Sequence, residues 1–309
     1  MSVSQTLFTI AIIVTVVAVA MFVRTVTDLV RLVRQGQPDR SRSDAPGTRL
    51  RTLAIETLGH TRMLKWTPIG IAHWFVFLGF ALLLFTLVTA YGQLLDPDFH
   101  LPLIGKWTPF LAATEFFAGG TFLGITYLIV RRQIDHPRRL GRSSRFAYSN
   151  IKQGYFVEAI VFGVGACILV LRGLEGVRAG VTSWSVDHLV SWPLVSLFSG
   201  LNDDQTATWI TAIASLKIAI SMTWFIVVAN NRIMGVAWHR FTAFFNIYFK
   251  RHANGDIALG ELQPMRSKGE LINFEDPKDD DVFGIGVIND FTWKGRLDLL
   301  TCTECGRCQ

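Results

Sequence analysis

The chain has 309 residues, half of them hydrophobic, and a formal net charge of +6. Charged residues make up only 17% of the sequence, which is low for a soluble protein, and the apolar residues occur in long uninterrupted blocks. Apolar blocks of about 20 residues are typical of membrane-spanning helices. The excess of basic residues lies in short segments beside these blocks, as membrane topology requires, so we expect a lipid bilayer and no nucleic acid as partner.

Five apolar blocks predict an all-α integral membrane protein, because a backbone in lipid satisfies its own hydrogen bonds only as a helix or a closed barrel. The predicted spans lie near residues 7–23, 68–94, 110–130, 156–171 and 207–228. The apolar segment at residues 183–201 contains Asp, His, Pro and Gly, and we expect it to be an interfacial or re-entrant piece. Residues 1–252 are therefore interpreted as a transmembrane domain.

The charges of the connecting segments predict the topology. The segments after the first, third and fifth predicted spans are basic, whereas those after the second and fourth contain few basic residues. Because basic segments stay in the cytoplasm, the N-terminus is expected outside and the C-terminus inside. The predicted location is the inner, or plasma, membrane of a cell, crossed several times.

The end of the chain carries a C-x-x-C-x-x-C run formed by Cys302, Cys305 and Cys308. Two-residue spacings allow a tight loop to present three thiolates to one 4Fe–4S cluster, as in bacterial ferredoxins. A zinc site or a redox dithiol are the alternatives, but zinc sites usually pair two separated C-x-x-C knuckles and a dithiol needs only two cysteines. Residues 253–309 are interpreted as a cytoplasmic linker and the beginning of a ferredoxin-like iron–sulfur domain.

A 4Fe–4S cluster ordinarily takes four ligands, and the run supplies three. We therefore expect the sequence to be C-terminally truncated, with a catalytic part missing. No catalytic residue is assigned for this reason.

Two histidines are candidate haem ligands. His73 lies in the second predicted span and His239 follows the fifth, and the predicted topology places both near the cytoplasmic face. Histidines from different helices at similar depth can ligate one haem b iron from both sides. The alternative is that His239 only reaches to the membrane interface.

Other polar residues of the apolar blocks have plainer interpretations. Lys217 in the fifth span and Glu115 in the third are costly in lipid, and an ion pair between them is expected. A role for either residue in protonating a quinone is a weaker hypothesis. His60 is expected to be solvated, His100 to be a loop residue or to line a quinone site, and Cys167 to be a buried small hydrophobe.

Four stretches of the sequence resemble one family. They are GIAHWFVFLGF (Gly70–Phe80), AYGQLLDPDFHLPLIGKW (Ala90–Trp107), FNIYFKR (Phe245–Arg251) and the segment from Asn273 to Gln309. The chain resembles the membrane-anchored iron–sulfur reductases of actinobacteria. In that family a haem b domain like the nitrate reductase gamma subunit is fused to an iron–sulfur domain related to heterodisulfide reductase. Members often carry a second histidine in the last span, where this chain has Lys217.

The resemblance implies a route for electrons. They would leave a soluble donor such as reduced electron transfer flavoprotein, pass 4Fe–4S clusters and haem b, and reduce menaquinone. An oxidoreductase of the same architecture acting on a small acid or a disulfide remains an alternative. A transporter or sensor with a metal-binding tail is a further one, and it predicts a polar pathway through several spans.

Overall fold

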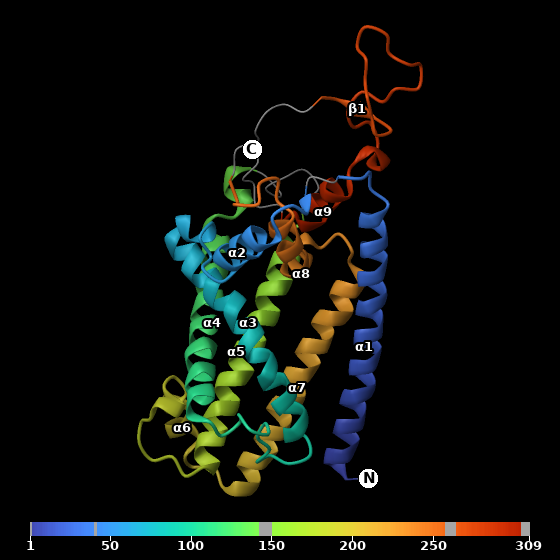
Figure 1. Cartoon of the computed structure of the whole chain (residues 1–309). Helices are drawn as coiled ribbons and strands as arrows, with labels where there is room; N and C mark the ends of the chain where they lie inside the picture. The colour runs from blue at the N-terminus through green and yellow to red at the C-terminus, as the bar shows by residue number, and fades with distance from the viewer. Residues whose placement is uncertain (1, 40–41, 142–149, 257–263, 304–309) are drawn as a thin grey trace. The chain divides into compact units, whose positions relative to one another are not determined.

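The computed structural model in Figure 1 describes residues 2–39, 42–141, 150–256 and 264–303. The chain divides into two compact units. Unit 1 contains Met1–Phe22 and Arg62–Asn230, and unit 2 contains Val23–Thr61 and Asn231–Gln309. The long first helix contributes to both units, because the division falls within it.

Among the described residues, five helices are long and apolar enough to cross a membrane, and the described chain is mostly helical, as the sequence predicted. They are α1 (Val3–Arg34), α3 (Thr67–Gln93), α4 (Thr108–Ile134), α5 (Ile151–Arg178) and α7 (Asp203–Asn230). Four of these helices extend past the apolar block that predicted them, because helical hydrogen bonding continues into polar residues at the ends, whereas α3 matches its predicted span to within one residue. The extension matters most in α5, where it brings Arg172 and Glu175 inside the helix.

Unit 1 is a bundle in which four helices form a closed ring of neighbours: α3 packs on α4, α4 on α5, α5 on α7 and α7 on α3. The residues of α1 that belong to this unit join the bundle through Ala18, which is packed in one cluster with Ala90, Ala214 and Ile218. The hydroxyls of Thr15 and Tyr91 share a hydrogen bond beside this cluster. We call the end of the bundle that carries residues 94–107 and α6 the α6 end.

Small residues let the helices approach closely. A Cβ added to Gly124 in α4 would lie 2.8 Å from the carbonyl oxygen of Ala72 in α3. Thr121, one turn earlier, donates a hydrogen bond to the carbonyl oxygen of Phe75 across the same interface. Backbones that pack without intervening side chains are common between membrane helices, where van der Waals contact drives association. Gly124 therefore fixes the separation of α3 and α4.

The segment between α5 and α7 does not form a span. It contains the short helices η4 (Val186–His188) and α6 (Trp192–Phe198), which pack against α4 and α5 respectively at the α6 end. This agrees with the predicted broken piece at residues 183–201. Two further short helices of unit 1 are η2 (Met63–Lys65) and η3 (Pro137–Leu140).

Unit 2 is built from short elements around α8. Its helices besides the end of α1 are α2 (Pro46–Thr57), α8 (Gly235–Tyr248), η5 (Ile288–Asp290) and α9 (Trp293–Thr301). A two-stranded antiparallel hairpin, β1 (Arg266–Ser267) with β2 (Glu270–Leu271), lies between α8 and α9 in the sequence. Both α2 and α9 pack on α8. A ferredoxin-like domain is not among the described residues, and the run that predicted it mostly lies beyond them.

The substitution Gly124→Ala is expected to lower the melting temperature of the detergent-solubilised protein. Alanine in a helix is normally better than glycine by up to about 1 kcal/mol, but here the new methyl group overlaps a backbone carbonyl that cannot move aside. Gly165→Ala in α5 is the matched control, because its Cβ would be 3.8 Å from the nearest atom. Equal changes in both variants, measured by thermal unfolding, would contradict the close approach of α3 and α4.

Candidate functional site

A carboxylate buried at the α6 end organises the polar part of unit 1. Glu115 in α4 is fully buried. Its Oε2 accepts hydrogen bonds from the backbone N–H groups of Val190 and Ser191 at 3.0 and 2.9 Å, and its Oε1 accepts from the Ser191 hydroxyl at 2.8 Å. The Arg172 Nε donates to the same Oε1 at 2.9 Å. Four donors thus compensate a charge that would otherwise be costly inside a membrane bundle.

Arg172 extends this arrangement into a network across three helices. Its guanidinium also donates to Glu175 Oε2 at 2.7 Å and to the carbonyl oxygen of Asp187. The Gln93 side chain of α3 donates to Glu175 Oε1 at 2.7 Å. The network Gln93–Glu175–Arg172–Glu115 therefore connects α3, α5 and α4 to the segment that contains η4. We call it the buried ion network.

His188 lies at the edge of the buried ion network. Burial, together with the nearby positive charge of Arg172, holds the pKa of His188 below its ordinary value. The ring is therefore neutral near pH 7, and its Nδ1 lies 3.1 Å from the hydroxyl of Ser191. The neutral ring adds no charge to a network in which Arg172 faces two carboxylates.

The expected ion pair between Glu115 and Lys217 is wrong. Glu115 is paired with Arg172, whereas the Lys217 Nζ donates to the carbonyl oxygen and the hydroxyl of Thr86, both at 2.7 Å. The prediction failed because the fourth span was taken to end before Arg172, which left this cation in a loop. An Arg and a Glu three residues apart at the end of an apolar block were the signal that could have revealed the network.

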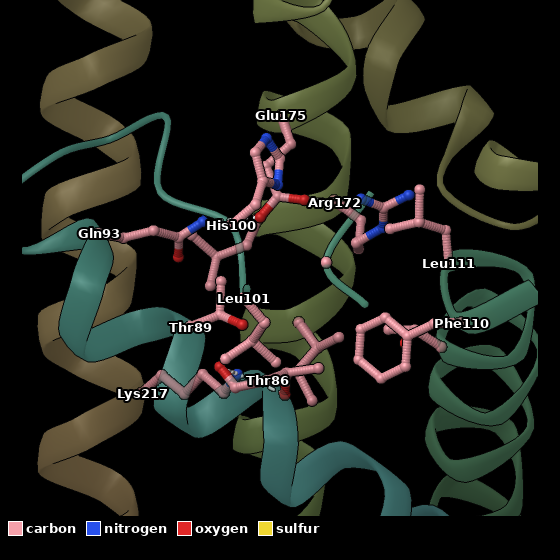
Figure 2. A pocket seen from close by; sticks show the side chains of 14 residues that line it. Thr86, Thr89, Gln93, His100, Leu101, Phe110, Leu111, Arg172, Glu175 and Lys217 are labelled. Atoms are coloured by element: carbon pink, nitrogen blue, oxygen red, sulfur yellow. Dashed lines mark hydrogen bonds and ion pairs between the residues drawn. The ribbon is translucent and has the colours of Figure 1, made fainter. Parts of the chain in front are cut away.

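A small polar cavity lies between the buried ion network and Lys217 (Figure 2). Its volume is about 40 Å³. The lining comes from α3, α4, α5, α7 and the 94–107 loop, and its polar members are Thr86, Thr89, Gln93, His100, Thr114, Arg172, Glu175 and Lys217. Figure 2 shows Glu175, Arg172, Gln93 and His100 together at one end, with Lys217 and Thr86 at the other. His100 is thus a loop residue that faces a cavity.

The cysteine run begins directly after α9, in unit 2. Cys302 is the first residue past this helix and is exposed. Cys305 and Cys308 lie outside the described residues. Within the described ranges no group of three or more His, Cys, Asp or Glu side chains is arranged to hold a metal ion. The iron–sulfur ligand set therefore stays a prediction from the spacing of the run.

The helix that leads to the cysteines is held to the end of α1 by backbone pairing. Gln37 donates its N–H to the carbonyl oxygen of Phe291 at 2.9 Å and accepts from the N–H of Trp293 at 3.0 Å. The Arg296 guanidinium donates to the carbonyl oxygen of Leu32, in the last turn of α1, at 2.9 Å. The last turn of a helix leaves carbonyl groups without intrahelical partners, and a cation stabilises them. The start of α9 is thus fixed to a membrane-length helix.

Aromatic and glycine contacts hold α9 against α8. The rings of Trp293 and Phe249 meet edge to face with their centroids 4.9 Å apart. At the beginning of α8, a Cβ on Gly235 would overlap the carbonyl oxygen of Cys302. His239 lies one turn further along α8. The first cysteine of the run is consequently packed against the helix that carries a candidate haem ligand.

The two candidate haem ligands fall in different units. His73 lies in α3 of unit 1 and His239 in α8 of unit 2, and both are half-buried. Burial, together with the positive charge of Arg240, lowers the pKa of His239 to about 4. The ring is therefore neutral, which is the form that coordinates haem iron. The shared haem of His73 and His239 stays a prediction.

The structure also shows the surroundings of Cys167 and His60. Cys167 is buried in α5, as expected. His60 is not a solvated residue: it is buried, adopts a positive φ of 50°, and places its Nδ1 3.0 Å from the carbonyl oxygen of Thr57. It lies three residues past the end of α2, in a segment whose basic composition gave no sign of burial.

Two curated proteins are similar to most of the chain. The chain is 24% identical over 304 residues to the "Probable iron-sulfur-binding oxidoreductase FadF" of Bacillus subtilis (strain 168), and the match covers 96% of this chain and 38% of the relative. It is 22% identical over 281 residues to the "EtfAB:quinone oxidoreductase" of Syntrophomonas wolfei subsp. wolfei (strain DSM 2245B / Goettingen), covering 87% and 35%. No family model and no solved structure matches the chain.

The chain is thus related at low identity to iron–sulfur and quinone oxidoreductases. It spans little more than a third of the length of the curated relatives it matches.

The substitution Arg172→Met is expected to destabilise the protein by about 3–5 kcal/mol, because it leaves two buried carboxylates without their cation. The double variant Glu115→Gln with Arg172→Met should be destabilised less than Arg172→Met alone, because it no longer contains the unpaired carboxylate of Glu115. Chemical unfolding followed by tryptophan fluorescence measures both. If the destabilisation of the double variant equals the sum of those of Glu115→Gln and Arg172→Met measured separately, Glu115 and Arg172 do not form the pair described.

Proposed function

We propose that this chain is the membrane domain, with the first cluster ligands, of an oxidoreductase that transfers electrons from a soluble flavoprotein to menaquinone. The electrons would pass a 4Fe–4S cluster and haem b. The donor would be a reduced electron transfer flavoprotein, as the name of the Syntrophomonas wolfei relative indicates for that protein. The name of the Bacillus subtilis relative supports the iron–sulfur part.

The observation that carries the proposal is the packing within unit 2. Helix α9, which Cys302 follows directly, packs on α8, which carries His239. A chain that binds a cluster through the cysteine run and a haem through His239 would therefore hold the two groups on adjacent helices. The backbone pairing of Gln37 with the residues before α9 would keep the cluster close to the end of a membrane helix.

The residue types of the candidate ligands suit the two groups. Cys302, Cys305 and Cys308 would hold the 4Fe–4S cluster, and a further ligand would come from another part of the protein. His73 and His239 would hold haem b as neutral imidazoles. When bound, these groups supply one-electron transfer between a two-electron flavin and a two-electron quinone. The membrane-length helices keep the redox groups at the bilayer, where menaquinone dissolves.

The predicted topology places the donor on the cytoplasmic side. The N-terminus is proposed to lie outside and the cysteine run in the cytoplasm, at the plasma membrane. Of the helices described, five are long enough to support this arrangement. The α6 end of the bundle would then face outside.

The cluster is tested by metal analysis and low-temperature EPR of the complete polypeptide after reduction. We expect bound iron and an iron–sulfur signal that Cys305→Ser abolishes. Cys167→Ser is the matched control and should keep the signal, because this thiol is buried in α5 and is not part of the C-x-x-C-x-x-C run. Zinc without iron would refute the proposal.

The haem is tested by the reduced-minus-oxidised optical spectrum of the same preparation. A haem b band is expected, and His73→Ala or His239→Ala should each remove it. His136→Gln should keep the band, since this residue lies at the start of η3 and accepts a hydrogen bond from the N–H of Arg138. A band that survives both alanine substitutions would show that the ligands are wrongly assigned.

A further inference from the structure

Lys217 has an unusual environment for a cation in a membrane bundle. It is buried, and its position is about 20 Å along α7 from the start of that helix at ~1.5 Å per residue. Its two hydrogen-bond acceptors both belong to Thr86 and are uncharged. An ammonium group has three donors, so these contacts use two of them. The cavity that Lys217 lines can supply a partner for the third N–H.

The acidic residue that lines this cavity, Glu175, already has partners for both of its oxygens. Both carboxylate oxygens of Glu175 accept hydrogen bonds, one from Gln93 and one from Arg172. In the part of the chain that the structure describes, no carboxylate lies within ion-pair distance of Lys217. An uncompensated ammonium inside a membrane is costly, so the position of Lys217 requires another source of solvation.

A second polar group points to the same source. The hydroxyl of Thr114 in α4 is buried, lines the cavity, and has no hydrogen-bond partner among the described residues. A hydroxyl buried without a partner loses the hydrogen bonds that it would make in water. Lys217 and Thr114 come from different helices and share one cavity, so one ligand can satisfy both.

The volume of the cavity identifies that ligand as water. About 40 Å³ is available, and a water molecule needs roughly 10–15 Å³ by the same measure together with two to four polar partners. Two or three water molecules fit, whereas the ring of a quinone or a haem does not. The polar lining supplies the partners from four helices.

The cavity is bounded at the α6 end by the loop rather than by a helix. His100, Leu101 and Gly105 line it from the 94–107 loop, and Figure 2 shows Leu101 and Thr89 between the His100 end and Lys217. The charged and titratable groups that surround Lys217 are Arg172, Glu175 and Cys167 from α5 and His100 from the loop. From α3 and α4 the cavity receives only threonine and glutamine as polar groups.

We propose that this cavity holds a short chain of water molecules that connects Lys217 to the aqueous phase at the α6 end, and that Lys217 passes protons from that phase to the quinone reaction. The second half of this statement rests on the proposed function. Reduction of a quinone to a quinol consumes two electrons and two protons. The ammonium of Lys217 releases one proton and recovers it from the water chain, so the lysine returns to its starting state after each transfer.

The water connection is tested without any redox activity. Lys217→Cys and, separately, Ala214→Cys are exposed to silver ions added outside spheroplasts, and the thiols left unreacted are then labelled with a maleimide after denaturation and identified by mass spectrometry. Ala214 is the matched control, because it is fully buried one turn away on the same helix but packs in an apolar cluster. Silver should protect the cysteine at position 217 and leave the one at position 214 unprotected.

Two outcomes of the silver experiment overturn the inference. Equal reactivity of the two positions would show that the cavity has no access to external water. Protection at position 217 only when silver is added to inside-out vesicles would show that access comes from the opposite end of the bundle.

Proton uptake is tested in proteoliposomes of the complete polypeptide with menaquinone, oriented so that the α6 end faces the lumen. A pH-sensitive dye is trapped in the lumen, and reduced EtfAB is added outside. We expect the lumen to become alkaline as menaquinol forms. Lys217→Met should slow this alkalinisation by about 100-fold, the magnitude typical of losing a proton-transfer group, whereas Lys217→Arg tests whether the fold tolerates substitution.

The two experiments separate the two claims. Menaquinol formation without luminal alkalinisation in the unmodified protein overturns the proton role of Lys217 while leaving the proposed function intact. Absence of menaquinol contradicts the proposed function, and the silver result then still decides whether the cavity is hydrated from the α6 end.

Discussion

The ion pair between Glu115 and Arg172 is the constraint on which unit 1 depends. Both side chains are buried in a bundle whose helices are apolar enough to cross a membrane. Charges in such an environment are costly unless they are paired, hydrogen-bonded or in contact with water. Glu115 meets this requirement by accepting from Val190 and Ser191 as well as from Arg172, and so draws the segment between α5 and α7 against α4. The same network forms one wall of the polar cavity.

The features that the sequence predicted well are those that depend on a contiguous stretch of residues. Length and uninterrupted hydrophobicity were sufficient for the five membrane-length helices, because helix formation in lipid is a local requirement. The broken segment at residues 183–201 was recognisable from its Pro, Gly and charged residues. The burial of Cys167 followed from its apolar neighbours.

The partners of buried polar groups could not be read from the sequence, because they depend on which helix ends meet. Lys217 was expected to bind Glu115, yet its acceptors are a threonine hydroxyl and a backbone carbonyl, neither of which has a sequence signal. Arg172 was assigned to a loop because the apolar block ends before it. The helix in fact continues past that block to Arg178. The attachment of the cysteine segment to the end of α1 joins Gln37 and Trp293, which are far apart in the chain.

The two units carry different features, and both sets of features are consistent with an electron-transferring membrane protein. Unit 1 supplies an apolar bundle with a small polar cavity, and unit 2 packs Cys302 against α8, the helix that carries His239. A transporter would instead need a polar pathway through several spans. The polar cavity of unit 1 has a volume of only about 40 Å³. The relatives named as iron–sulfur and quinone oxidoreductases point to the same class of chemistry.

The central claim is that electrons pass from a flavoprotein through this protein to menaquinone. The most direct measurement is anaerobic mixing of chemically reduced EtfAB with the complete polypeptide in nanodiscs that contain menaquinone, followed by flavin absorbance and quinol analysis. The account predicts that the flavin is reoxidised and that one menaquinol forms for each pair of electrons lost. A flavin that stays reduced, with iron bound to the protein and menaquinone unchanged, would contradict it.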